Sequence, residues 1–162
     1  MNSVDKVKYV PLNITQYADA ISSASLNIQN AHHVTLLCQF LGDVDGNAKL
    51  SITSHTAADG DTTTLTDYKG YVTGADVGAV AADTFSATAV AVDTGQDYVT
   101  LTEATFEKRL LVIELDVAKI NPAHKWIRVK FSADATAGTC IVIAAVQPRF
   151  KQKDIPTMVK TA

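Results

Sequence analysis

The chain has 162 residues, of which 47% are apolar and 19% charged, and its formal net charge is −3. This composition is typical of a folded globular protein and excludes a disordered chain, and the length predicts one domain with a sizeable core. The small net charge indicates neither nucleic acid nor an anionic membrane as a partner.

The first third of the chain predicts short strands separated by turns. Residues 7–14 are expected to be extended, and Pro11 confines them to a sheet edge or an arm. Apolar and polar residues then alternate over 24–28, as in a half-buried strand, and further strands are predicted over 34–40 and over 49–56, with Leu50 and Ile52 inward. The intervening segments 29–33 and 43–47, and the Asp-Gly pair at 59–60, carry residues typical of turns.

The middle of the chain is rich in Thr, Ala, Asp and Gly. Strands are predicted over 68–73 and 84–92, joined by a loop over 74–79, and a short strand over 98–101. The small side chains predict a thin core or a sheet that is exposed on one face. This part is also acidic: residues 42–103 hold ten acidic and two basic residues, a local net charge of −8, which leaves +5 for the remainder. The asymmetry suggests that one end faces water and the other an acidic partner.

Three predicted strands form the centre of the domain. Residues 110–115 are a nearly unbroken apolar run, 126–131 alternate cleanly, and 140–146 are apolar on both faces. Residues 116–120 predict one helical turn before Asn121-Pro122. A turn is expected over 135–139.

These elements predict an all-β chain, an antiparallel β-sandwich of the jelly-roll type with extended N- and C-terminal arms. Residues 1–20 are the expected N-terminal arm, 21–147 the sandwich body and 148–162 a basic C-terminal arm. Extended arms of this kind order on a neighbouring chain, for example by adding a strand to its sheet.

No pattern predicts an enzyme, a metal or another cofactor. His32 and His33 fall in an expected turn, and neither His55 nor His124 stands near a cysteine or in a zinc motif. The sequence contains no G-x-S-x-G and no glycine-rich phosphate loop. Residues 43–47 resemble the start of a calcium loop, but the glycine is fourth and the twelfth position is Ser54, so a hairpin turn is the better interpretation.

Cys38 and Cys140 align with apolar neighbours, which predicts two buried thiols, with a disulfide between the two sheets as the alternative. No apolar signal-peptide region is visible at the N-terminus, and no apolar run is long enough to span a membrane. We therefore expect no membrane partner.

The best candidate for a binding surface is the 126–131 strand, which places Trp126, Arg128 and Lys130 on one side. An ordinary outer sheet face, a protein interface and a nucleic-acid surface all fit this pattern, and the interface is favoured over the nucleic acid. The candidate interface also includes the basic residues at the start of the C-terminal arm and the aromatic residue between them: Arg149, Phe150, Lys151 and Lys153.

The segment Ser51-Ile52-Thr53-Ser54-His55-Thr56-Ala57-Ala58-Asp59-Gly60 and the ending KWIRVKFSADATAGTCIVIAAVQPRF at 125–150 resemble, in style and layout, small structural proteins of tailed bacteriophages, above all capsid decoration (cement) proteins. The resemblance covers about residues 24–150. It implies a virion protein that is made in the host cytoplasm and binds the outside of the head. Its partners would be the major capsid protein, whose subunits it bridges, and further copies of itself, usually as a homotrimer and sometimes as a dimer. No direct contact with nucleic acid is implied.

Two alternatives remain open at this point. The first is a tail or head–neck component of the same kind of virus. The second is a carbohydrate-binding β-sandwich module, in which Trp126 would be the platform for the sugar.

Overall fold

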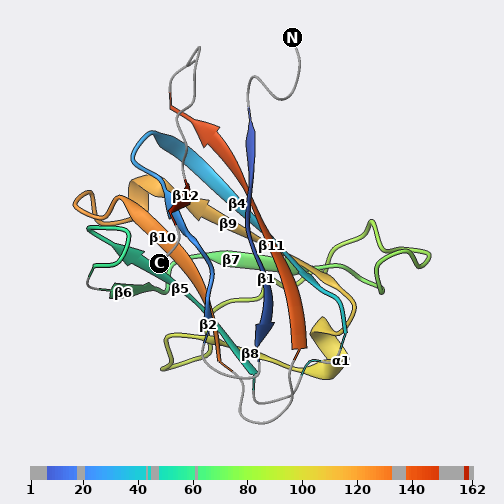
Figure 1. Ribbon diagram of the computed structural model, residues 1–162. Coiled ribbons are helices and arrows are strands. Elements are labelled where there is room, and N and C mark those ends of the chain that lie inside the picture. The colour runs from blue at the N-terminus through green and yellow to red at the C-terminus, as the bar shows by residue number, and fades with distance from the viewer. Residues whose placement is uncertain are drawn as a thin grey trace.

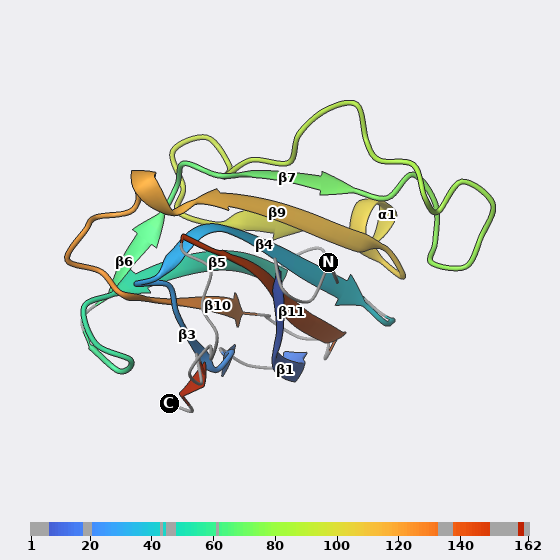
Figure 2. The same ribbon diagram turned by 90° about the horizontal axis from the view of Figure 1, so that it is seen from above.

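The computed structural model describes residues 7–17, 21–42, 44, 48–60, 62–132, 138–149 and 159–160, and for 13–17, 62 and 160 it describes the backbone alone. The described residues form two antiparallel β-sheets packed face to face (Figures 1 and 2). The expected all-β sandwich is therefore confirmed. Its jelly-roll type stays a prediction.

Sheet A has five strands in the spatial order β1-β11-β4-β9-β7. Their bounds are Lys8–Tyr17 for β1, Gly138–Pro148 for β11, Ala31–Phe40 for β4, Leu110–Asp116 for β9 and Lys69–Val72 for β7. The central strand is β4, and the first and the eleventh strands of the chain are neighbours.

Sheet B is built on β10 and β5, which pair over residues 126–132 and 49–55. Its strands are β12 (Val159–Lys160), β3 (Ser25–Asn27), β10 (Trp126–Ser132), β5 (Ala48–His55) and β6 (Thr62–Leu65) in spatial order, with β2 (Ile21–Ser22) against β10 and β8 (Val99–Leu101) against β5. A helical turn, α1 (Glu103–Phe106), and a 3-10 turn, η2 (Val117–Lys119), flank β9 in the chain.

Successive strands change sheets almost throughout. From β7 onward each strand lies in the sheet opposite to that of the strand before it. The core is therefore closed by strands that are distant in the sequence.

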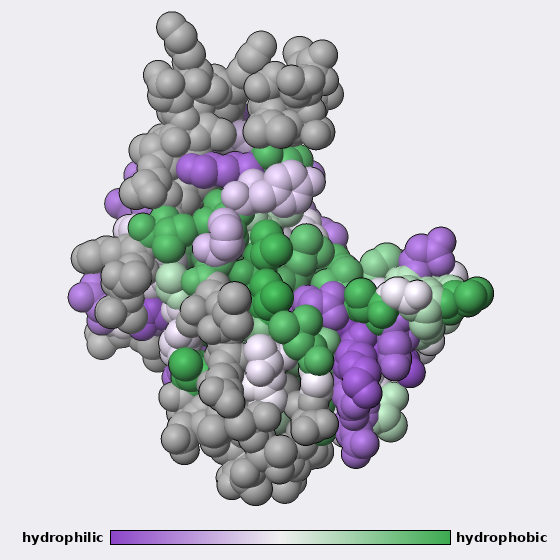
Figure 3. Space-filling view, turned by 45° about the vertical axis from the view of Figure 1, so that its right-hand side comes forward, coloured by the Kyte–Doolittle hydropathy of each residue, from purple (hydrophilic) through white to green (hydrophobic). Residues whose placement is uncertain are grey.

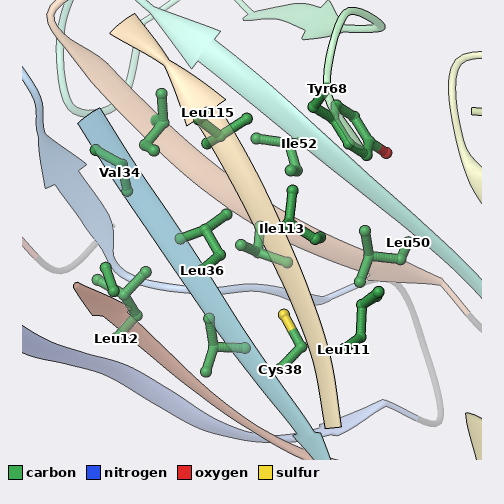
Figure 4. Packing of buried hydrophobic residues seen from close by; sticks show 14 of the residues in the cluster. Leu12, Val34, Leu36, Cys38, Leu50, Ile52, Tyr68, Leu111, Ile113 and Leu115 are labelled. Carbon is green, nitrogen blue, oxygen red and sulfur yellow. The ribbon is translucent and has the colours of Figure 1, made fainter. Parts of the chain in front are cut away.

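The core lies between the sheets and is filled by the inward residues of alternating strands. Figure 4 shows side chains of β4, β9 and β5 gathered there, including Leu36, Ile113 and Ile52, which are at most 1% exposed. At one end Phe40 makes edge-to-face contacts with Phe106 and Phe131, at centroid distances of 5.8 and 6.4 Å. Each large side chain buried in this way stabilises the fold by about 1.5–3 kcal/mol.

The two cysteines are buried free thiols, as the first interpretation of the sequence predicted. They do not face each other from opposite sheets. Cys38 lies on β4 and Cys140 on the adjacent β11, where Cys38 pairs with Val142. Burial, followed by the nearby Cys38 thiol, raises the pKa of Cys140, so neither reactivity nor metal binding is favoured there.

The structure differs from the expected elements in four places, one of which is the turn expected over 135–139, because Gly138 and Thr139 already belong to β11. Residues 84–92 are not a strand: they contact β7 and Thr73 through the isolated bridges Gly70–Val90 and Thr73–Phe85 and through hydrogen bonds between Ser86 and Val72. Their small side chains bury too little apolar surface for a strand of their own. Residues 62–65, not predicted, form β6, and His32 and His33 lie in β4 instead of a turn.

The expected arms also contribute to the sheets. Residues 8–17 of the N-terminal segment form β1, which pairs with β11 and keeps Val10 and Leu12 buried. Residues 159–160 of the C-terminal segment form β12, which pairs with β3. Burial of apolar residues on alternate positions explains why β1 joins the sheet.

Candidate interaction surfaces

The outer face of sheet A carries an apolar row that crosses all five strands. Because side chains alternate along a strand, the strands that send Leu36 and Ile113 into the core send Leu37 and Val112 outward. The register aligns one outward residue of each strand, in the order Pro11, Ile143, Leu37, Val112 and Tyr71. Four of the five are half-buried and Pro11 is exposed.

Further apolar side chains widen this row. They are Tyr9 and Ala145 on one side of it and Ile141, Leu110 and Leu41 on the other. Tyr9 and Leu41 are 57% and 50% exposed, which is high for large apolar side chains. Figure 3 shows apolar side chains gathered at the middle of this face. We call the ten residues of these two groups the apolar face.

Polar residues frame the apolar face at both ends of the strands. At one end His33 on β4 pairs with Glu114 on β9, whose cross-strand neighbour is Lys69. At the other end Arg109 lies 3.9 Å from the Asp76 carboxylate. An apolar centre with a polar rim is the usual composition of a protein interface.

Both edges of sheet A are shielded, among the described residues, against pairing with another strand. β1 carries Pro11, which has no N–H to donate, and its register shifts between Pro11 and Asn13. β7 is covered by residues 84–92, since Gly70 and Val90 exchange two backbone hydrogen bonds of 2.7 and 2.6 Å. The faces of sheet A are thus better suited to docking than its edges.

The outer face of sheet B is polar and carries the residues that the sequence singled out. Trp126, Arg128 and Lys130 point outward from β10 and are half-buried. Arg128 is hydrogen-bonded within the chain: its guanidinium donates to the Ser25 hydroxyl and to the Ala58 carbonyl. This side chain therefore fixes the loop after β5 to β3 and β10.

His55 is covered by that same loop and is fully buried. Its Nδ1 donates to the Gly60 carbonyl at 3.2 Å, so Nε2 accepts from the Thr53 hydroxyl at 2.8 Å. Burial lowers the pKa of His55, and Arg128, His124 and Lys130 lower it further, whereas the bond to Gly60 opposes them. The histidine is a neutral structural group at pH 7.

Arg149 lies at a different place, at a concavity at one end of the sandwich. Its lining includes the buried Ile120 and the basic residues His124, Lys125 and Arg149. The Arg149 Nε donates to the Ala31 carbonyl at 3.0 Å, which ties this side chain to the start of β4. The other expected interface residues, Phe150, Lys151 and Lys153, lie outside the described residues.

The apolar face was not identified as a surface from the sequence. Its signal was present in the apolar runs of β9 and β11, but such runs predict strands buried on both faces. The structure buries one side of these strands and leaves the other partly open to solvent, because among the described residues no strand or helix packs on the outer side of sheet A.

The described part of the chain holds no cluster of three or more His, Cys, Asp or Glu side chains that could bind a metal ion. Within the same residues, no helix has the length and hydrophobicity needed to cross a membrane. No family model matches the sequence, and neither the curated proteins nor the solved structures include a significant match.

Proposed function

We propose that this chain is a structural virion protein, a decoration or cement protein that binds the outside of a phage head and bridges major capsid protein subunits. Its partners are then the capsid shell and further copies of itself. The observation that carries the proposal is the apolar face: a small sandwich exposes a framed apolar sheet surface whose natural use is assembly with other protein surfaces.

Two other features support an assembly role. Sheet B offers a second, polar surface with Trp126 and Lys130, so one molecule can contact two neighbours through different faces. Bridging several subunits also lets individually weak contacts add.

The alternation of successive strands between the sheets, with β4 and β10 central, supports a sandwich of the jelly-roll type.

The test is binding of the purified protein to undecorated phage heads, followed by counting the bound copies per particle. We expect stoichiometric binding and heads that withstand a higher temperature before releasing their DNA. Trp126→Ala should lower the number of bound copies, because Trp is enriched among the residues that dominate interfaces.

Phe85→Ala is the matched control, since Phe85 is an aromatic residue 48% exposed on the segment that covers β7. Its binding should equal that of the unmodified protein. A protein that leaves the heads undecorated at any concentration would refute the proposal and favour the tail component or the carbohydrate-binding module.

A further inference from the structure

We infer that the apolar face is the contact between two copies of this chain, which pack sheet A on sheet A about a two-fold axis. The inference rests on the proposed assembly role and names the surface used for self-association. It can be tested on the purified chain alone.

The first argument is that three neighbouring strands of sheet A carry apolar residues on both sides near their middle. In β4, β9 and β11 the inward residues fill the core, and the outward residues include Leu37, Val112 and Ile143. Antiparallel sheets with one face in solvent usually alternate apolar and polar residues. Apolar residues on the outward side of three adjacent strands therefore indicate a further layer, and a second copy supplies it.

The second argument is the symmetry of the apolar row about the central strand. β4 has β11 and β1 on one side and β9 and β7 on the other. A two-fold axis along β4 therefore places Leu37 against Leu37 of the partner subunit and Ile143 against Val112 of the partner subunit. Tyr71 then meets Pro11 of the partner subunit, so every position of the row faces an apolar residue.

The rim is compatible with the same axis. Tyr9, Ala145, Thr35, Glu114 and Lys69 form the next row across the sheet. The rotation places Lys69 over the Tyr9 ring of the partner subunit and Glu114 over Ala145 of the partner subunit. No like charges of this row meet, and a lysine over a tyrosine ring is an attractive contact.

The third argument is size. With strands about 4.8 Å apart and residues about 3.3 Å apart, the five strands of sheet A, which are 4 to 11 residues long, have a footprint of roughly 670 Å². That lies within the roughly 600–1,000 Å² that each partner contributes to a standard interface. Two such sheets pack at about 10 Å in an aligned orientation, which two identically twisted sheets satisfy.

The experiment measures the mass in solution by light scattering over a range of protein concentrations. We expect a species near twice the 17.3 kDa of one chain, which dissociates on dilution. Leu37→Lys places two like charges at the axis and should raise the dissociation constant about 30-fold or more, as for other central interface residues.

A matched control is Thr64→Lys, which introduces the same charge on an outward position of β6 in sheet B and should leave the dissociation constant unchanged. Val112→Thr keeps the branched shape and suits a strand, so it tests the contact even where Leu37→Lys fails to fold. We expect it to weaken the dimer about 10-fold, because a buried hydroxyl loses its water.

A monomer at all concentrations, a trimer, or a dimer that tolerates both substitutions in sheet A would each overturn the inference. The proposed function has a separate outcome. A monomer that still binds phage heads would support the proposed function and refute the dimer. A dimer that does not bind the heads would support the dimer and refute the proposed function.

Discussion

The two sheets of the sandwich share one core but present opposite surfaces to solvent. Sheet A carries Leu37, Val112 and Ile143 outward, whereas sheet B carries Arg128 and Lys130. The core needs only one apolar side from each sheet. The polar side chains on the outer face of sheet B can be hydrated or bonded within the chain, whereas the apolar face of sheet A is the surface that we assign to a second copy.

Neighbouring residues of one strand separate the two roles of sheet A most clearly. Leu36 is fully buried in the core and Leu37 points outward on the same strand. In dilute protein, Leu36→Ala should lower the free energy of unfolding by about 2–5 kcal/mol, because it leaves a cavity. Leu37→Ala should lower it by less than about 1 kcal/mol.

Urea denaturation at two protein concentrations measures both effects. Leu37→Ala should remove the increase in stability with concentration that a dimer produces, and Leu36→Ala should retain it. Equal losses for the two substitutions would mean that the outward side of sheet A belongs to the core of the single chain.

On sheet B, we expect the charged side chain of Arg128 to stabilise the fold and that of Lys130 to contribute little. Arg128→Ala leaves the Ala58 carbonyl and the buried Ser25 hydroxyl without their guanidinium donor and should cost about 1–3 kcal/mol. Lys130→Ala, two residues along the same face, should change the free energy of unfolding by no more than about 0.5 kcal/mol. Thermal unfolding of the two variants provides the measurement, and a larger loss for Lys130→Ala would contradict this division.

The smallest expected effect concerns pH. Burial lowers the pKa of His55 in the folded chain below its ordinary value of 6.5, so the unfolded chain binds the proton more readily. The free energy of unfolding should therefore fall as the pH drops below 6.5 and be unaffected by His55 well above it. Urea midpoints between pH 5 and pH 8 test this.

The variant His55→Gln should flatten the part of this profile that belongs to His55. The exposed His32 is the control, and His32→Gln should keep the slope. A profile that His55→Gln leaves unchanged would show that titration of His55 does not cause the dependence.

The sequence predicted the strands with strong apolar patterns and missed those whose stability depends on neighbours. β4, β9, β10 and β11 follow from period two or from apolar runs. β6 is too short and too polar to show a pattern, and it exists because it pairs with β5. Residues 84–92 have a strand-like composition but few large apolar side chains to bury, so they form an irregular segment along the edge of β7 instead of a strand.

The candidate surface was less predictable than the fold, because it depends on strand order. The pattern of residues 126–131 placed Trp126 and Arg128 outward correctly, but it could not show that Arg128 donates to Ala58, about 70 positions earlier in the chain. The apolar row exists only once Ile143, Leu37 and Val112 are aligned by the register of three strands. No local pattern contains that alignment.

The pairing of β1 with β11 has a consequence for synthesis of the chain. The partner of Tyr17 is Gly138, so β1 leaves the ribosome long before the strand it needs. With roughly 120 intervening residues made at about 5–20 residues per second, the delay is roughly 6 to 24 s. Throughout that time the apolar residues of β1 lack the strand with which β1 pairs in the folded chain. Because Pro11 has no N–H to donate, it disfavours pairing of this segment with strands of other nascent chains during translation.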